Sequence, residues 1–199
     1  MRSRLASARR LMATGEQREP PLDPSSAQSK SLLFLSLSPF VGPLESPGVS
    51  LLVRPGRPSD LDALVRSTLG NAFDSEGITL DEATVRRGVG ALLSDPAKGR
   101  LFVAEDGGRV IGSTYVTFEW SDWHDAWYWW IQSAFVVPER RGTGVWTALY
   151  RAIQAAATQA GNVRSIRLYV EAANEAGLRA YRGHGMAETH YKMFEQVVR

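Results

Sequence analysis

The chain has 199 residues, of which 44% are hydrophobic and 22% charged, with a net charge of +2 and no cysteine. This composition is typical of a globular protein, and so small a net charge gives no general attraction for nucleic acid. The absence of cysteine excludes disulfides, cysteine-ligated zinc and thiolate catalysis, and it predicts a reducing, cytoplasmic location. The three histidines lack the spacing of a metal site, so no metal is expected.

The first 48 residues differ from the rest of the chain, because they hold six of its ten prolines and show no sustained periodicity. We interpret them as a disordered tail, followed by one domain over residues 49–199. Four arginines without an acid among the first fifteen residues leave an organelle-targeting signal as the alternative to a cytoplasmic location. The longest apolar run, 32–41, is about half of the ~20 residues that span a bilayer, so no membrane partner is expected.

Periodicity and turn residues in the domain predict strands and helices that alternate as in an α/β fold. In chain order, the predicted elements are a strand at 49–55, helices at 58–73 and 79–95, strands at 100–105, 109–120 and 126–137, a helix at 143–160, a strand at 165–171, a helix at 174–184 and a strand at 187–197. The expected helix caps are Ser59, Thr79 with Glu82, and Asn174. This order predicts a central mixed, mostly antiparallel sheet with helices on both faces.

The most informative segment is FVVPERRGTGVW, residues 135–146, in which a strand leads through a glycine loop directly into a helix. Gly142 and Gly144 allow successive backbone N–H groups to turn toward one point, where the helix N-terminus adds its positive dipole. Such an arrangement binds phosphate. The segment lacks the Lys-Ser/Thr of a Walker loop and the third glycine of a dinucleotide fingerprint, and by itself it is also compatible with an ordinary turn.

A second pattern, at a helix farther along the chain, gives this loop a specific interpretation. The loop pattern comprises Val136, Val137, Pro138, Arg141, Gly142, Thr143, Gly144, Val145 and Trp146, and the helix pattern comprises Asn174, Gly177, Tyr181, Gly185 and Met186. Together they resemble the motifs of the GNAT superfamily of acyl-CoA-dependent N-acyltransferases, over residues 50–196. The resemblance implies a GNAT-like fold. It also implies an N-acetyltransferase that moves an acetyl group from acetyl-CoA to a primary amine of a small molecule, by direct attack in a ternary complex.

The resemblance further implies a role for each matching residue. The backbone amides of residues 141–146 would hold the pyrophosphate of acetyl-CoA. The strand end at Phe135, Val136 and Val137 would pair with the pantetheine arm like an added strand, and Asn174 would contact the same arm. Tyr181 would protonate the departing thiolate, which suits a phenol with a pKa near 10.

Two residues depart from the family pattern. Trp146 replaces a small residue at the end of the loop motif, and Gln132 stands where many members have a glutamate that acts as the base or holds a water. A glutamine cannot accept a proton, so it can only orient a water or the substrate. The alternative bases are Glu119, Asp122, His124 and Glu171. The alternative function is a catalytically weak GNAT-fold module that binds acyl-CoA.

Five of the six tryptophans lie between Glu119 and Trp130. Strand alternation predicts one face with Tyr128, Trp130, Gln132 and Ala134, and the other with Trp127, Trp129, Ile131 and Ser133. Tyr128 and Trp130 would then line the approach of the substrate to Gln132. Trp120, at the turn, would form the pocket rim or contact a second copy in a homodimer.

The charges near the tryptophans suggest the kind of acceptor. No Lys or Arg lies between Val110 and Glu139, although several carboxylates accompany the aromatic rings. Aromatic faces beside carboxylates suit a cation, so a small cationic amine is the predicted acceptor. The alternative is that these acids only solvate the hairpin tip. Stacking of single-stranded nucleic acid needs a basic groove, which this segment lacks.

Overall fold

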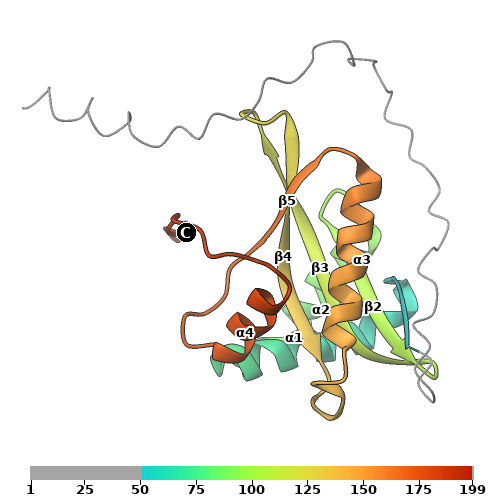
Figure 1. The fold of residues 1–199 in the computed structure, drawn as a ribbon. Coiled ribbons are helices and arrows are strands. Elements are labelled where there is room, and N and C mark those ends of the chain that lie inside the picture. Colours follow the sequence, from blue (N-terminus) through green and yellow to red (C-terminus); the bar gives the residue numbers. More distant parts are fainter. Residues whose placement is uncertain (1–50, 199) are drawn as a thin grey trace, which may run out of the picture. The chain divides into compact units, whose positions relative to one another are not determined.

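The computed structural model describes residues 51–198, so the predicted tail at 1–48 lies outside the described residues. The strands are β1 (Leu51–Pro55), β2 (Arg100–Asp106), β3 (Arg109–Ser121), β4 (Ala126–Val136) and β5 (Val163–Leu168). The helices are α1 (Leu61–Glu76), α2 (Glu82–Ser94), α3 (Val145–Ala160) and α4 (Glu175–Gly183), with short 3-10 turns η2 (Pro58–Asp60) and η3 (Pro138–Arg140). Figure 1 shows their arrangement.

The strands form one five-stranded sheet in the order β1-β2-β3-β4-β5. The first three pairings are antiparallel, and tight connections join β2 to β3 and β3 to β4. The β2–β3 turn uses Gly107 and Gly108 at φ 56° and 82°, a conformation that favours glycine. β5 is parallel to β4 and follows a crossover through α3. The predicted mixed, mostly antiparallel sheet is therefore confirmed.

Helices cover both faces of the sheet, as predicted (Figure 1). α3 packs one face, with Leu149 and Ile153 fully buried against Phe102, Ile131 and other core side chains. Burying each of these two side chains contributes about 1.5–3 kcal/mol. On the other face α1 and α2 pack against residues of β2 that point away from α3. The alternation along β2 thus divides the core into two layers.

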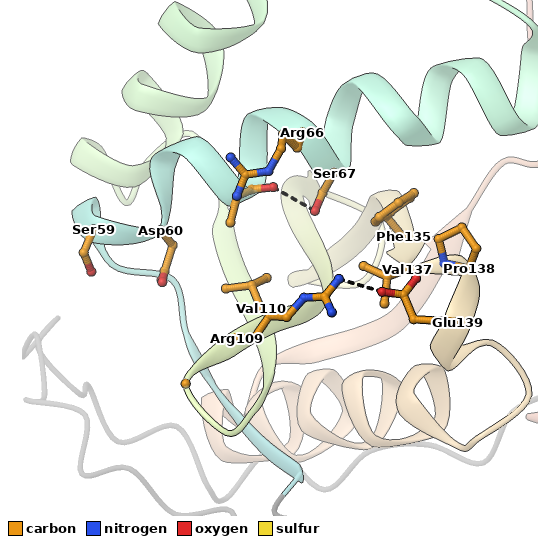
Figure 2. Close-up of a pocket in the computed structure, with 12 residues that line it drawn as sticks. Ser59, Asp60, Arg66, Ser67, Arg109, Val110, Phe135, Val137, Pro138 and Glu139 are labelled. Atoms are coloured by element: carbon orange, nitrogen blue, oxygen red, sulfur yellow. Dashed lines mark hydrogen bonds and ion pairs between the residues drawn. The ribbon is translucent and has the colours of Figure 1, made fainter.

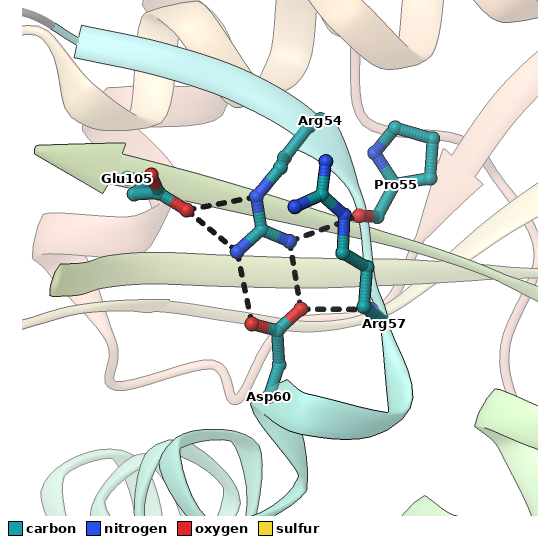
Figure 3. Close-up of polar contacts among 5 residues, drawn as sticks. All are labelled: Arg54, Pro55, Arg57, Asp60 and Glu105. Carbon is teal, nitrogen blue, oxygen red and sulfur yellow. Dashed lines mark hydrogen bonds and ion pairs between the residues drawn. The ribbon is translucent and has the colours of Figure 1, made fainter. Parts of the chain in front are cut away.

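A buried ion cluster ties the start of α1 to the sheet (Figure 3). Arg54 on β1 donates to both carboxylate oxygens of Asp60, at 2.7 and 2.9 Å, and to Glu105 on β2 at 2.6 and 2.8 Å. The hydrogen bond from Arg54 is the main cause that lowers the pKa of Asp60. Asp60 also accepts from the Arg57 amide at 2.7 Å. Asp60, and not the predicted Ser59, is therefore the residue that precedes α1.

The start of α2 also differs from the prediction. The helix begins at Glu82, and its N-cap is Asp81, whose carboxylate accepts from the backbone N–H of Thr84 at 2.8 Å and from its hydroxyl at 2.7 Å. The predicted capping box of Thr79 and Glu82 does not form. Asp81 offers a stronger N-cap than a threonine two residues earlier, and its carboxylate satisfies one of the free amides of the first turn.

The predicted last strand at 187–197 is wrong. No strand follows α4 within the described residues, and this segment is exposed throughout, with Phe194 92% accessible. Alternating apolar and polar residues favour a strand only where a neighbouring strand supplies hydrogen bonds. The described sheet ends at β5, so its fifth strand is also its edge.

Candidate active site

The glycine loop after β4 has the geometry of a phosphate cradle. Gly142 and Gly144 adopt φ of 74° and 86°, and a Cβ added to either would meet open space. The backbone N–H groups of residues 142–147 have no acceptor within residues 51–198. These amides surround the N-terminus of α3, whose dipole favours an anion. The residues present therefore fit a pyrophosphate group, bound mainly by backbone.

The free amides begin one residue later than predicted. The amide of Arg141 donates to the carbonyl of Pro138 at 3.2 Å, closing η3. The Arg141 side chain turns toward α1, where it pairs with Asp74, and its Nε donates to the carbonyl of Val136 at 3.0 Å. Thr143 closes the loop through a 2.7 Å hydrogen bond to the carbonyl of Arg140. Arg141 and Thr143 thus shape the loop through their own hydrogen bonds.

The end of β4 has an open edge. Its pairing with β5 stops at Ile131 opposite Leu168, whereas its pairing with β3 continues to Val136 opposite Gly112. Residues 132–136 therefore have a strand neighbour on one side within the described sheet. This edge contains Phe135 and Val136, and the amide of Val137 is already bonded to the carbonyl of Ile111. The edge leads directly into the glycine loop (Figure 1).

A β-bulge at Gln132 changes the alternation of β4. Ile131 lies opposite Val116 and Ser133 opposite Tyr115, so Gln132 is an extra residue without a partner on β3. Tyr115 packs in the layer under α1 and α2, and Ser133 faces the same side. The prediction that Ser133 shares a face with Ile131, and Ala134 with Gln132, is therefore wrong.

Both ends of the Gln132 amide are engaged. Its Nε2 donates to the hydroxyl of Thr117 at 2.6 Å, and its Oε1 accepts from the hydroxyl of Tyr169 at 2.5 Å. Gln132 thus links β3 to the residue that follows β5, across the place where β4 and β5 separate. Tyr169 was not among the predicted site residues, because nothing in its local sequence distinguishes it from a strand residue.

Tyr128 and Trp130 lie on the same side of the sheet as Glu119, and a cation of the chain itself lies among them. The indole N–H of Trp130 donates to Glu119 at 2.5 Å. Arg167 on β5 stacks over Tyr128, with Cζ 3.3 Å from the ring centroid, and lies 5.6 Å from that of Trp130. The segment without Lys or Arg therefore receives a cation from a neighbouring strand. Trp120 lies apart, packed at 4.9 Å against Trp127 on the α3 face.

Tyr181 and Trp146 meet where α4 contacts the start of α3, and Asn174 lies at the other end of α4. Asn174 caps α4, accepting from the amide of Gly177 at 2.9 Å. Trp146 directs its side chain to α4, with its ring 5.8 Å from both Tyr150 and Tyr181 and 6.4 Å from His184. It therefore turns away from the cradle, and its buried Nε1 has no acceptor in the described part of the chain. Burial raises the pKa of Tyr181, so its phenol stays protonated at neutral pH.

The four alternative bases are engaged by other side chains or backbone, or lie in the hairpin turn. Asp122 and His124 belong to the β3–β4 turn, where His124 Nδ1 is 3.0 Å from the Tyr128 hydroxyl and 3.1 Å from that of Ser121. Glu119 is held by Trp130 near the same end of the hairpin. Glu171 accepts from the amide of Ala173 at 2.6 Å. In Figure 1 the hairpin tip and the glycine loop lie at opposite ends of β4.

A cavity of about 600 Å³ lies beside this site, between the start of α1, the β2–β3 turn and the end of β4 (Figure 2). It shares Phe135 with the open edge and is also lined by Val137, which follows that edge. Its two carboxylates are engaged, since Asp60 pairs with Arg54 and Glu139 with Arg109 at 2.6 Å. The cavity therefore offers a binding surface without a free acid or base. Residues 51–198 contain no cluster of His, Asp or Glu that could hold a metal and no helix long and apolar enough to cross a membrane.

Known proteins agree with this geometry. The model of the Acetyltransferase (GNAT) family matches residues 65–186. A possible acetyltransferase from Clostridium difficile 630 is 34% identical, with a TM-score of 0.71, covering 75% of this chain and 98% of its own. An aminoglycoside N-acetyltransferase solved with CoA is 18% identical, with a TM-score of 0.63 and coverage of 77% and 99%.

A third solved structure shares the fold. It is an aminoglycoside acetyltransferase from an uncultured soil metagenomic sample, 17% identical with a TM-score of 0.61, covering 75% of this chain and 97% of its own. Comparison with curated protein sequences gave no match. The family match spans more than half of the chain, and it agrees with the 34% identity to a solved relative. The chain therefore belongs to the GNAT family of acetyltransferases.

Proposed function

We propose that this protein is an acetyl-CoA-dependent N-acetyltransferase whose acceptor is a primary amine of a small molecule. When bound, acetyl-CoA supplies the acetyl group as a thioester, which the amine attacks directly in a ternary complex. Two of the solved neighbours are aminoglycoside acetyltransferases, and one of these was solved with CoA. Their activity supports a small-molecule amine as the acceptor here.

The row of free amides at residues 142–147 carries this proposal. Six successive N–H groups without an acceptor at a helix N-terminus are the donors that a pyrophosphate needs. The open edge of β4 begins at Gln132 and ends at this loop, so a pantetheine arm can pair along it as an added strand. Asn174, which caps α4, is the residue that we propose contacts the same arm.

Tyr181 is the proposed general acid. Its raised pKa keeps the phenol protonated, so the hydroxyl can return a proton to the departing thiolate. Gln132 is a positioning residue, because its amide is bonded to Thr117 and Tyr169 and cannot accept a proton. The alternative bases are held by other hydrogen bonds or lie at the hairpin tip. We infer that the acceptor amine arrives deprotonated and that a water carries its second proton away.

The proposal is tested by incubating the full chain with acetyl-CoA and a panel of primary amines. Release of the CoA thiol should depend on the amine, and mass spectrometry should find the amine heavier by one acetyl group. Calorimetry measures acetyl-CoA binding independently. Binding without transfer to any amine would favour the alternative, a GNAT-fold module that binds acyl-CoA. No binding would contradict both.

A further inference from the structure

We propose that Arg167 is the acceptor-docking residue of this enzyme and that the acceptor is an amine that carries a carboxylate. This inference rests on the proposed function and specifies its substrate class. The observation behind it is the position of the Arg167 guanidinium, stacked 3.3 Å over Tyr128 and flanked by Trp130. The aromatic faces that would attract a cationic substrate are thereby occupied by a cation of the chain.

The guanidinium is held in place without using its hydrogen-bond donors. It forms an ion pair with Glu119, whose Oε1 lies 3.8 Å from Nη1, a distance longer than a hydrogen bond. The other oxygen of Glu119 accepts from Trp130. No hydrogen bond joins Arg167 to any other residue from 51 to 198, and its side chain is 29% exposed. A planar fork that is fixed by stacking and keeps its N–H groups free matches a carboxylate, which it can bind through two parallel hydrogen bonds.

Arg167 lies close to the expected reaction centre. It is paired in register with Trp130, and Gln132 follows two residues later on β4, which is ~7 Å along the strand. The hydroxyl of Tyr169 donates to Gln132, and the ring of the same tyrosine lies 6.4 Å from that of Trp130. A carboxylate on Arg167 therefore leaves room for a short carbon chain that places an amine beside Gln132. A diamine would instead bring a second cation against the guanidinium, with like-charge repulsion.

The test compares acceptors that share the amine and chain length but differ at the far end. The three series are linear amino acids, their amides and the corresponding diamines, assayed with acetyl-CoA and the full chain. Wild type should use the amino acids best. Arg167→Gln should lower kcat/KM for the amino acids by ~10- to 100-fold, through KM, and leave the amides unchanged. For the amino acids, the kcat/KM of Arg167→Lys should lie between that of wild type and that of Arg167→Gln. Arg151→Gln, an exposed arginine of α3, is the matched control and should change nothing.

Several outcomes would overturn the inference while leaving the proposed function intact. These are equal use of the three series by wild type, a preference for amides or diamines, and a loss in Arg167→Gln that is the same for all acceptors. If no acceptor is acetylated, calorimetry in the presence of CoA decides. Binding of the amino acids that Arg167→Gln abolishes supports the docking role, and absent or equal binding refutes it. Acetyl-CoA binding, measured separately, reports on the proposed function alone. Thermal unfolding of each variant controls for the lost stacking on Tyr128.

Discussion

Trp146 and Tyr181 pack edge to face, with ring centroids 5.8 Å apart and ring planes at 77°. Trp146 lies in the first turn of α3, directly after the glycine loop, and Tyr181 lies on α4. The same indole also contacts His184 at the end of α4. The bulky residue that departs from the family's loop pattern therefore joins the phosphate cradle to the helix that carries the proposed general acid.

The first prediction follows from this contact. Trp146→Ala should displace α4 and with it Tyr181, and should lower the free energy of unfolding by about 3 kcal/mol, the lower end of the range for Trp→Ala, because Trp146 is only partly buried. We expect kcat to fall while the loop amides still bind acetyl-CoA. Trp146→Phe is the control, because it keeps an aromatic edge on Tyr181 and removes an indole N–H that is buried without an acceptor. Urea unfolding measures the free energy of unfolding, and acetyl-transfer assays measure kcat. An alanine variant with full kcat would show that Tyr181 is positioned by other contacts.

The second prediction concerns Tyr181 itself. Tyr181→Phe should lower kcat by about 10²-fold or more if proton donation limits the rate, with acetyl-CoA binding unchanged. Because burial raises the pKa of this phenol above its ordinary 10.0, loss of the acid from the wild-type rate should set in at a higher pH than the ionisation of an ordinary tyrosine. The pH profile of kcat and calorimetry with acetyl-CoA check the two parts. An unchanged kcat in Tyr181→Phe would remove Tyr181 from the mechanism.

The third prediction tests the glycine loop. Gly144→Glu should abolish acetyl-CoA binding, because it places a negative side chain at the phosphate cradle. The backbone strain of any side chain at φ 86° is a separate effect, and Gly107→Glu controls for it. Gly107 also has a positive φ, 56°, and its added Cβ would likewise meet open space, but it lies in the β2–β3 turn. Both variants should lose similar stability in thermal unfolding. Equal acetyl-CoA binding by the two variants would contradict the cradle.

The fourth prediction concerns the buried ion cluster. Asp60→Asn replaces one of the two carboxylate partners of the buried Arg54 guanidinium and leaves Glu105, so the free energy of unfolding at pH 7 should fall by about 1.5–3 kcal/mol. The pKa of Asp60 is lowered from 3.8, so its contribution is complete above pH 3.8 and is lost as the pH falls through the lowered pKa. The difference between wild type and variant should therefore shrink in acid. Asp62→Asn, in an exposed pair with Arg86, is the control and should change stability little. If the difference in unfolding free energy between wild type and Asp60→Asn stayed constant down to acid pH, the ionised Asp60 carboxylate would not be its source.

Sequence periodicity predicted the layers and most of the elements, because the buried faces of α3 and β2 repeat at regular intervals. The bulge at Gln132 could not be predicted this way. An extra residue in one strand is visible only when the register of its partner is known. The same limit applies to the last strand, whose alternation is real but whose partner is not among the described strands.

The candidate site was predictable where it depends on backbone and local order. The glycine loop, the start of α3 and the cap at Asn174 follow from residues close together in the chain. Arg167 and Tyr169 were missed as site residues because their neighbours, Tyr128 and Gln132, are 39 and 37 residues away in the sequence. Only the parallel pairing of β4 with β5 brings them together. The prediction of a cationic acceptor rested on charges within one segment and could not include a cation from the next strand.

The parallel pairing of β4 with β5 also has a consequence for the order in which the protein folds. β2, β3 and β4 join through tight turns, so their contacts are local and can form early. β5 reaches β4 only after the chain has crossed the sheet as α3, which closes a much longer loop. The glycine loop, α3 and Tyr181 follow β4 in the chain and belong to this late step. Pulsed hydrogen exchange during refolding should find the amides of β5 protected after those of β2 to β4, whereas simultaneous protection would contradict this order.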